Sequence, residues 1–148
     1  MGIDEIDREL RDLSVKDCPL CHTHLGAASE SSNCSECGGR SRTRTLQPLL
    51  SHLRCTMDSE IIEKPMLAFA MSRHECKLIG ELFPSFVSVS LFGEYGPGHV
   101  TGVDARDLSR YEDSSFSGVY SCLLFDYFLE HGSALAESFR VIVPGGVF

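Results

Sequence analysis

The sequence has no apolar segment long enough to cross a bilayer and no N-terminal export signal. Of its 148 residues, 43% are hydrophobic and 23% are charged, which is the composition of an ordinary globular protein. No apolar run approaches the roughly 20 residues that a membrane-spanning helix needs. The first ten residues, MGIDEIDREL, are acidic and contain no apolar stretch of signal-peptide type. We therefore expect a cytoplasmic protein.

The chain also lacks the excess of basic charge that a general nucleic-acid-binding protein needs. It has 21 acidic and 13 basic side chains and a net charge of −8. Its positive charge is concentrated between residues 18 and 55, so a contact with nucleic acid is expected only there. The alternate spacing of Arg40, Arg42 and Arg44 predicts one edge of an extended strand. That edge either binds phosphate or carboxylate groups or is simply solvated.

Large apolar residues are scarce between residues 18 and 44, so hydrophobic burial cannot stabilise this segment. Two CxxC pairs, Cys18–Cys21 and Cys34–Cys37, lie here with twelve residues between them. Each pair can present two thiolates to one ion, and glycines after the second pair permit a left-handed turn. Four thiolates at tetrahedral geometry suit Zn²⁺, and such a closed set is structural because it has no open coordination position. The spacing predicts a four-cysteine zinc ribbon over residues 18–55.

Two alternatives to zinc remain open for the four cysteines. They are free or disulfide-paired thiols, and an iron site of rubredoxin type that uses the same ligands. A disulfide framework fits poorly, because the chain has an odd number of cysteines, seven, and no export signal. His22 and His24 lie beside the first pair but compete with four better-spaced thiols. The other cysteines are expected to be free thiols, the last two of them largely buried: Cys55, Cys76 and Cys122.

The periodicity of apolar residues predicts helices and strands in alternation. Residues 1–17 are expected to form an amphipathic helix. From residue 56 onward, short apolar runs alternate with helical patterns, which predicts an α/β fold with a parallel sheet of βαβ units. The expected strands are 66–70, 86–92, 100–103 and 116–125. The expected helices are 46–54, with Pro48 in its first turn, 75–82 and 133–141.

The second half of the chain resembles a class I S-adenosylmethionine-dependent methyltransferase of the type 11-like group. It carries Phe116-Ser117-Gly118-Val119, then Ala134-Leu135-Ala136-Glu137, then Arg140-Val141-Ile142-Val143-Pro144-Gly145-Gly146, similar to the family pattern "fDvV … aL.E..RvLkPGG". Upstream, Gly102-Val103-Asp104-Ala105-Arg106-Asp107-Leu108 is similar to "gDa.dLpf". The CxxC segment resembles the zinc-ribbon front of some such enzymes. The resemblance implies a partial Rossmann-like methyltransferase sheet over 56–148, truncated to four strands and the start of a fifth, behind the ribbon.

The resemblance also implies where S-adenosylmethionine would bind. Ligands of open α/β sheets lie outside the carboxyl ends of the strands. Asp104 would accept from the adenine amino group, and Ala105 would offer its backbone N–H to the ring. Ala70 begins the loop that approaches the cofactor, Ser90 stands where relatives hold the ribose with a carboxylate, and Cys122 would face the methyl-donor region.

Two functions are consistent with these features. The first is a methyltransferase-like protein with a structural zinc ribbon, either degenerate or a fragment. The second is a non-catalytic zinc-ribbon module that contacts protein or nucleic acid and uses the half-Rossmann part as a scaffold. A loop without glycine over 70–75 and the missing carboxylate at Ser90 favour the second and predict weakened cofactor binding.

No residue stands out as a general base, and by position Asp126, Tyr127 and His131 are the candidates. Methyl transfer to a nucleophilic acceptor depends mainly on alignment, so the lack of an obvious base excludes nothing. The acceptor itself is not indicated by the sequence. The incomplete sheet is expected to expose an apolar edge, which predicts self-association or a covering protein partner.

Overall fold

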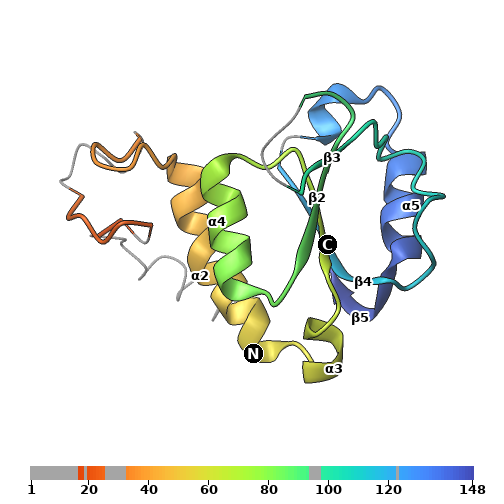
Figure 1. Cartoon of the computed structure of the whole chain (residues 1–148), viewed down its shortest axis with the longest axis horizontal. Coiled ribbons are helices and arrows are strands. Elements are labelled where there is room, and N and C mark those ends of the chain that lie inside the picture. The colour runs from red at the N-terminus through yellow and green to blue at the C-terminus, as the bar shows by residue number, and fades with distance from the viewer. Residues whose placement is uncertain (1–16, 19, 26–32, 94–97, 123) are drawn as a thin grey trace. The chain divides into compact units, whose positions relative to one another are not determined.

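The computed structural model describes residues 17–18, 20–25, 33–93, 98–122 and 124–148. The chain divides into two compact units, Met1–Pro48 and Leu49–Phe148, which we call the N-terminal unit and the sheet unit. The expected helix at residues 1–17 falls almost wholly outside the described residues. The helices are α2 (Ser41–Thr56), α3 (Ser59–Ile62), α4 (Arg73–Leu82) and α5 (Gly132–Val141), with a 3-10 turn η2 (Phe125–Tyr127). The strands are β1 (Met66–Phe69), β2 (Phe86–Ser90), β3 (Val100–Thr101), β4 (Phe116–Ser121) and β5 (Ile142–Val147) (Figure 1).

The sheet unit contains five parallel strands in the spatial order β3-β2-β1-β4-β5. β1 lies between β2 and β4, with Met66 opposite Phe86 on one side and Gly118 on the other. All four residues of β1 are buried, as expected for a strand covered on both faces. The strand order reverses between β1 and β4, which is the switch point of a doubly wound sheet. The predicted α/β, Rossmann-like class is confirmed.

The strands are shorter than their apolar runs predicted. β2 ends at Ser90, so Leu91 and Phe92 are exposed rather than part of the strand. β4 ends at Ser121, so Cys122 lies just beyond the strand instead of within it. Pairing explains both corrections, because the four residues of β1 offer backbone partners to only a short stretch of each neighbour.

A capping box explains why α4 begins before the expected position. The Ser72 hydroxyl accepts a hydrogen bond from the backbone N–H of Glu75, and the Glu75 carboxylate accepts one from the N–H of Ser72 at 2.7 Å. This reciprocal arrangement fixes the first turn at Arg73. The buried face of α4 includes Leu78 and Ile79.

The segment Pro144–Gly146 of the family-like pattern is part of a strand. It lies inside β5, where the register with β4 shifts and the extra residues form a bulge. A Cβ on Gly146 would lie 2.5 Å from the carbonyl oxygen of Ser117. Glycine is needed here because the backbones of β4 and β5 approach too closely for a side chain.

Arginines 40, 42 and 44 do not lie along an extended strand. α2 begins at Ser41, and the N–H groups of Thr43 and Arg44 donate to the carbonyl of Arg40. Alternate spacing alone does not exclude a helix, and these residues favour one. Pro48 consequently lies inside α2 rather than in its first turn, where it removes one helical hydrogen bond.

The apolar core of the sheet unit draws on every strand except β3. Its members are buried residues of the strands, of the loop before β4 and of α5: Leu67, Phe69, Val89, Val103, Ala105, Leu108, Phe116, Val119, Ala134, Val141 and Ile142. Among the described residues, no helix is both long and apolar enough to cross a membrane.

Candidate functional site

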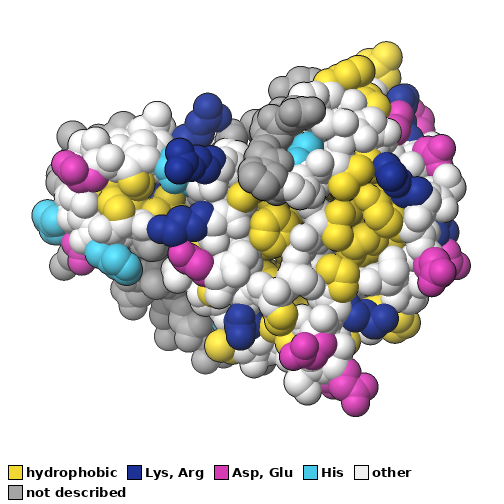
Figure 2. Space-filling model, in the orientation of Figure 1, with side chains coloured by type: hydrophobic (Ala, Val, Ile, Leu, Met, Phe, Trp, Pro, Cys, Tyr) yellow, Lys and Arg dark blue, Asp and Glu magenta, His cyan; other side chains and the backbone are white. Residues whose placement is uncertain are grey.

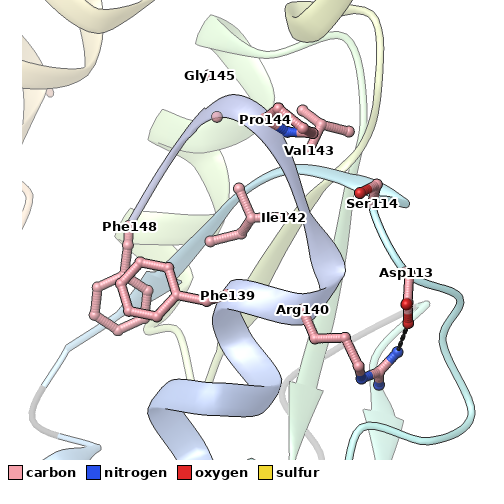
Figure 3. Close-up of a pocket in the computed structure, with 10 residues that line it drawn as sticks. Asp113, Ser114, Phe139, Arg140, Ile142, Val143, Pro144, Gly145 and Phe148 are labelled. Atoms are coloured by element: carbon pink, nitrogen blue, oxygen red, sulfur yellow. Dashed lines mark hydrogen bonds and ion pairs between the residues drawn. The ribbon is translucent and has the colours of Figure 1, made fainter.

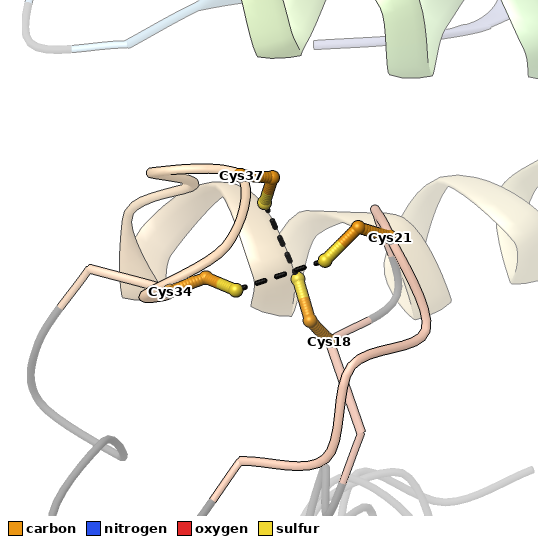
Figure 4. Close-up of side chains that lie close together, drawn as sticks. All are labelled: Cys18, Cys21, Cys34 and Cys37. Carbon is orange, nitrogen blue, oxygen red and sulfur yellow. Dashed lines mark hydrogen bonds between the residues drawn. The ribbon is translucent and has the colours of Figure 1, made fainter.

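The four cysteines of the two CxxC pairs converge in the N-terminal unit. Their sulfur atoms all lie within 4.8 Å of one another (Figure 4). The Sγ atoms of Cys18 and Cys37 are 3.7 Å apart, as are those of Cys21 and Cys34. Four sulfurs bound at about 2.3 Å to a tetrahedral ion would be separated by about 3.8 Å. The cluster therefore fits a tetrahedral metal ion, and no disulfide forms among the seven cysteines, all of which lie in the described residues.

The two knuckles have the same backbone design. In the first, the N–H of Cys18 donates to Thr23 and its carbonyl accepts from His22. In the second, Cys34 makes the matching bonds with Gly39 and Gly38. The fifth residue of each knuckle is left-handed, with φ of 61° at His22 and 72° at Gly38. His22 is thus a turn residue with an exposed ring.

The structure also keeps His24 out of the cysteine cluster. Its ring contacts Asp17 at 3.0 Å on the surface of the N-terminal unit.

Cys55, the nearest cysteine along the chain after the cluster, is exposed. Cys76, within α4, and Cys122, just past the end of β4, were expected to be largely buried, and both are half-buried.

The four thiols differ in their electrostatic surroundings. Hydrogen bonding to Thr23 lowers the pKa of Cys21 to about 6. Burial raises the pKa of Cys37 to about 12 and raises that of Cys18 as well. Metal binding requires all four as thiolates, so binding would release protons, most of all from Cys37.

Arg44 is part of the knuckle rather than of a basic surface. Its side chain is only 3% exposed, and Nη1 donates to the carbonyl of Gly39 at 3.0 Å. Gly39 in turn directs its N–H to the sulfur of Cys37 at 3.4 Å. Of the predicted basic triplet, Arg40 is exposed, and the side chain of Arg42 lies outside the described part of the chain.

The predicted cofactor residues lie at the carboxyl ends of the strands. Ala70 follows β1 directly, and its N–H donates to the carbonyl of Val89 in β2 at 2.8 Å. Its φ of 47° is left-handed, so this turn has the backbone form that favours glycine although it contains none. Ser121 ends β4 opposite Phe69 of β1, at the switch point. Among the described residues, its hydroxyl is the buried side-chain oxygen without a hydrogen-bond partner, so a polar ligand group would fit there.

Glu75, a buried carboxylate, contacts the strand β4 that ends at Ser121. Glu75 is 2% exposed and accepts from Tyr120 of β4 at 2.9 Å as well as from the N–H of Ser72. Burial raises the pKa of Tyr120 above its usual range. The first turn of α4 is therefore occupied by a carboxylate of the chain itself, where a helix N-terminus could otherwise bind an anionic ligand group. The signal in the sequence was the spacing of Ser72 and Glu75.

The hydroxyl of Ser90 is engaged by a histidine. Ser90 Oγ donates to the carbonyl of Gly93 at 3.0 Å and lies 2.7 Å from His99 Nε2. Since Ser90 has one proton to donate, His99 donates to it through Nε2, and its Nδ1 lies 2.7 Å from the hydroxyl of Ser88. His99 therefore occupies the end of β2, and no sequence signal pointed to it. Glu94, a carboxylate four residues after Ser90 in the sequence that could replace it, lies outside the described residues.

Asp104 is paired within its own turn. Both carboxylate oxygens accept from the Arg106 guanidinium, the shorter contact being 2.6 Å, and Oδ1 also accepts the backbone N–H of Arg106 at 2.9 Å. This hydrogen bonding lowers the pKa of Asp104. The neighbouring Ala105 is buried.

Glu137 and Arg140 of α5 hold the segment that carries Asp104. Glu137 accepts the N–H of Leu108 at 2.7 Å, and Arg140 donates to the carbonyl of the same residue at 2.9 Å. Arg140 also donates to Tyr111 and Asp113. We call this pair the α5 clamp. The Glu and Arg of the family-like pattern are thus positioning residues for the loop and not reacting groups.

The residues considered as a general base do not come together at the carboxyl ends of the strands. Asp126 is exposed. His131 precedes α5, where its ring contacts the carbonyl of Phe128 at 2.9 Å and the edge of Phe125. The side chain of Tyr127 lies outside the described part. The structure therefore assigns no base.

Among the described residues of the sheet unit, two of the hollows lie near α5. One of about 460 Å³ runs along β5 and its bulge, with Phe139 and Phe148 at one end and Asp113 and Arg140 at the other (Figure 3). The other, about 590 Å³, lies beside Arg106 and the α5 clamp. Figure 2 shows hydrophobic side chains gathered on the surface beside α5. Neither hollow includes Ala70, Ser90 or Asp104.

Comparison with known proteins finds a similarity to one family in the second half of the chain. Residues 86–148, from β2 to β5, match the family model described as a methyltransferase domain. A crystal structure of a proposed S-adenosyl-L-methionine-dependent methyltransferase from Methanococcus maripaludis is similar at 11% identity and a TM-score of 0.45. That alignment covers 68% of this chain, which spans 59% of the length of that structure. None of the curated proteins compared with the chain matches it. The resemblance to a class I methyltransferase is confirmed over residues 86–148.

Proposed function

We propose that this chain is an S-adenosylmethionine-dependent methyltransferase-like protein with a structural zinc ribbon at its N-terminus. The observation that carries the proposal is the methyltransferase-domain match over residues 86–148, which falls on a doubly wound parallel sheet. The unsatisfied hydroxyl of Ser121 at the switch point supports a polar ligand there. A cytoplasmic location remains part of this proposal.

The residues that would hold the cofactor surround the carboxyl ends of β1 to β4. Asp104 would accept from the adenine amino group, and the backbone N–H of Ala105 would donate to the ring. The turn at Ala70 would face the methionine part, and Ser90 the ribose. Cys122, just past β4, would lie near the methyl-donor region. When bound, S-adenosylmethionine supplies the methyl group, and these residues bind and orient it.

Cofactor binding is expected to be weak. Ser90 offers one hydroxyl where a carboxylate would accept from two ribose hydroxyls, and that hydroxyl already donates to Gly93. Glu75 occupies the first turn of α4, which removes a site for the methionine carboxylate. A lost charge-assisted hydrogen bond costs roughly 1.5–3 kcal/mol. We expect affinity at least about tenfold below that of a relative with the intact pattern.

The zinc ion would be held by Cys18, Cys21, Cys34 and Cys37. A closed four-thiolate site stabilises a segment that has few apolar residues, and structural zinc contributes on the order of 10 kcal/mol to such folds. Rubredoxin-type iron uses the same ligands and is separated from zinc by elemental analysis.

Calorimetric titration with S-adenosylhomocysteine tests the cofactor site. Wild-type protein should bind, and Asp104→Ala should weaken binding at least about tenfold, because adenine loses its carboxylate acceptor. Asp107→Ala removes an exposed carboxylate of the same loop and serves as the matched control. Binding that ignores the Asp104 change would show that the site is elsewhere.

The second candidate is a non-catalytic binding module, and the self-capped first turn of α4 favours it. Absence of any titration signal would support this reading. A protein partner would then be expected, because Arg44 is buried and the basic surface proposed for nucleic acid is reduced.

A further inference from the structure

Arg106 falls on the position of the family-like pattern "gDa.dLpf" at which any residue is allowed. Its guanidinium meets the two oxygens of Asp104 side on, with Nε 3.0 Å from Oδ1 and Nη2 2.6 Å from Oδ2. The centre of the same guanidinium lies 5.5 Å from the ring centroid of Phe128, which follows η2. Arg106 therefore links the loop after β3 to the segment after β4, at the carboxyl ends of the strands.

This pair of contacts resembles what a purine would make. A guanidinium is planar, pairs with a carboxylate through two parallel N–H groups, and stacks on aromatic rings. An adenine ring is also planar, offers amino N–H donors along one edge, and stacks on the same kinds of surface. One carboxylate cannot satisfy both partners, since both oxygens of Asp104 already accept from Arg106.

We propose that Arg106 occupies the adenine position at Asp104 as an internal competitor, so that a nucleoside ligand binds only when its guanidinium is displaced. The proposal rests on the function proposed above and names its specificity-determining residue. Arg106 acts as a positioning residue here, because it contacts Asp104 and not the reacting atoms.

The geometry makes the guanidinium displaceable. The Arg106 side chain is 52% exposed and that of Asp104 is 26% exposed, and ion pairs of this kind contribute little in water. The backbone N–H of Arg106 also donates to Asp104 Oδ1 at 2.9 Å. That bond survives truncation of the side chain, so Arg106→Ala should leave the Asp104 carboxylate oriented and open.

The test is calorimetric titration of the zinc-supplemented full chain with S-adenosylhomocysteine. Arg106→Ala should lower the dissociation constant about threefold to tenfold, the range expected from an exposed ion pair together with a cation–π contact. Arg110→Ala is the matched control, because Arg110 is exposed and its guanidinium likewise lies over a ring, that of Tyr111 at 5.7 Å. It should bind as the wild type does.

Two further measurements isolate the competition. Raising the salt concentration weakens the Asp104–Arg106 pair, so it should tighten binding to the wild type but not to Arg106→Ala. In a variant that already carries Asp104→Asn, Arg106→Ala should not increase the affinity for S-adenosylhomocysteine, because the carboxylate for which the two partners compete is gone. Thermal melting of Arg106→Ala alongside Arg110→Ala verifies that both variants fold.

Each outcome decides the proposal. Tighter binding by Arg106→Ala, or binding by that variant alone, supports it. Equal or weaker binding by Arg106→Ala, with the wild type also binding, overturns it and leaves the proposed function standing. Absence of binding by every protein refutes the proposed function and, with it, a competitor for that ligand.

Discussion

Replacing Arg140 with leucine tests whether the α5 clamp holds the Asp104 loop. Arg140 makes five hydrogen bonds, two to Glu137, one to Asp113 and one each to the carbonyls of Leu108 and Tyr111. Leucine fills much of the volume of the aliphatic stem but can make none of these bonds. The change therefore removes the hydrogen bonding and the charge together, with limited loss of packing.

The expected loss of stability follows from the burial of these partners. Hydrogen bonds to charged groups contribute about 1.5–3 kcal/mol each, but several made by one side chain are not additive. The Arg140 side chain is 27% exposed and Asp113 is largely exposed, which reduces the Asp113 contribution. Leu108 is fully buried, so its carbonyl would lose a partner that water replaces poorly. We expect a loss of about 3 kcal/mol.

Urea unfolding followed by circular dichroism measures this loss. Arg140→Lys should be intermediate, because lysine keeps the charge but cannot serve as many acceptors at once. Arg110→Leu is the control and should stay within about 0.5 kcal/mol of the wild type. A loss below about 1 kcal/mol for Arg140→Leu would refute the clamp. Such a result would mean that the loop is held without Arg140, by the burial of Leu108 and by its N–H bond to Glu137.

The remaining predictions concern the metal centre and the association state. Elemental analysis should give close to one zinc per chain, and full metal retention in a Cys34→Ser, Cys37→Ser double variant would contradict the site. His22→Gly should raise the melting temperature of the zinc-loaded protein, since a non-glycine residue at left-handed φ costs about 1 kcal/mol, whereas Gly38→Ala should lower it. Unchanged melting in both would show that the shared knuckle backbone contributes nothing. Light scattering should detect oligomers or aggregates, because β5 leaves one edge of the sheet unpaired among the described residues. A stable monomer at high concentration would show that this edge is covered by the chain itself.

The features that the sequence predicted well are local ones. Each CxxC pair lies within a single turn, so its spacing determines which sulfurs can meet. β1 stands out because it is apolar throughout and fully buried, and α5 because its apolar positions recur at helical intervals. In such segments, the order of apolar and polar residues is enough to predict the element that forms.

The features that the sequence did not predict depend on backbone geometry or on distant partners. His99 contacts Ser90 although nine positions separate them in the sequence, and no local pattern predicts such a contact. The sequence did not predict that Arg106 pairs with Asp104. A separation of two residues does not show whether the turn brings the two side chains together. The bulge at Gly146 likewise follows from how closely β4 approaches β5, which no residue preference reveals.

The central position of β1 determines the order in which the sheet can assemble. Met66 pairs with Phe86, which follows soon along the chain, and with Gly118, which follows much later. During synthesis, β1 can therefore join β2 while its other edge waits for β4 to emerge. The unpaired edge belongs to an apolar strand, so we expect the nascent chain to be most prone to aggregate before β4 has been synthesised. Closing the long loop between β1 and β4 is the slow step, and the two strand ends that flank the switch point meet only then.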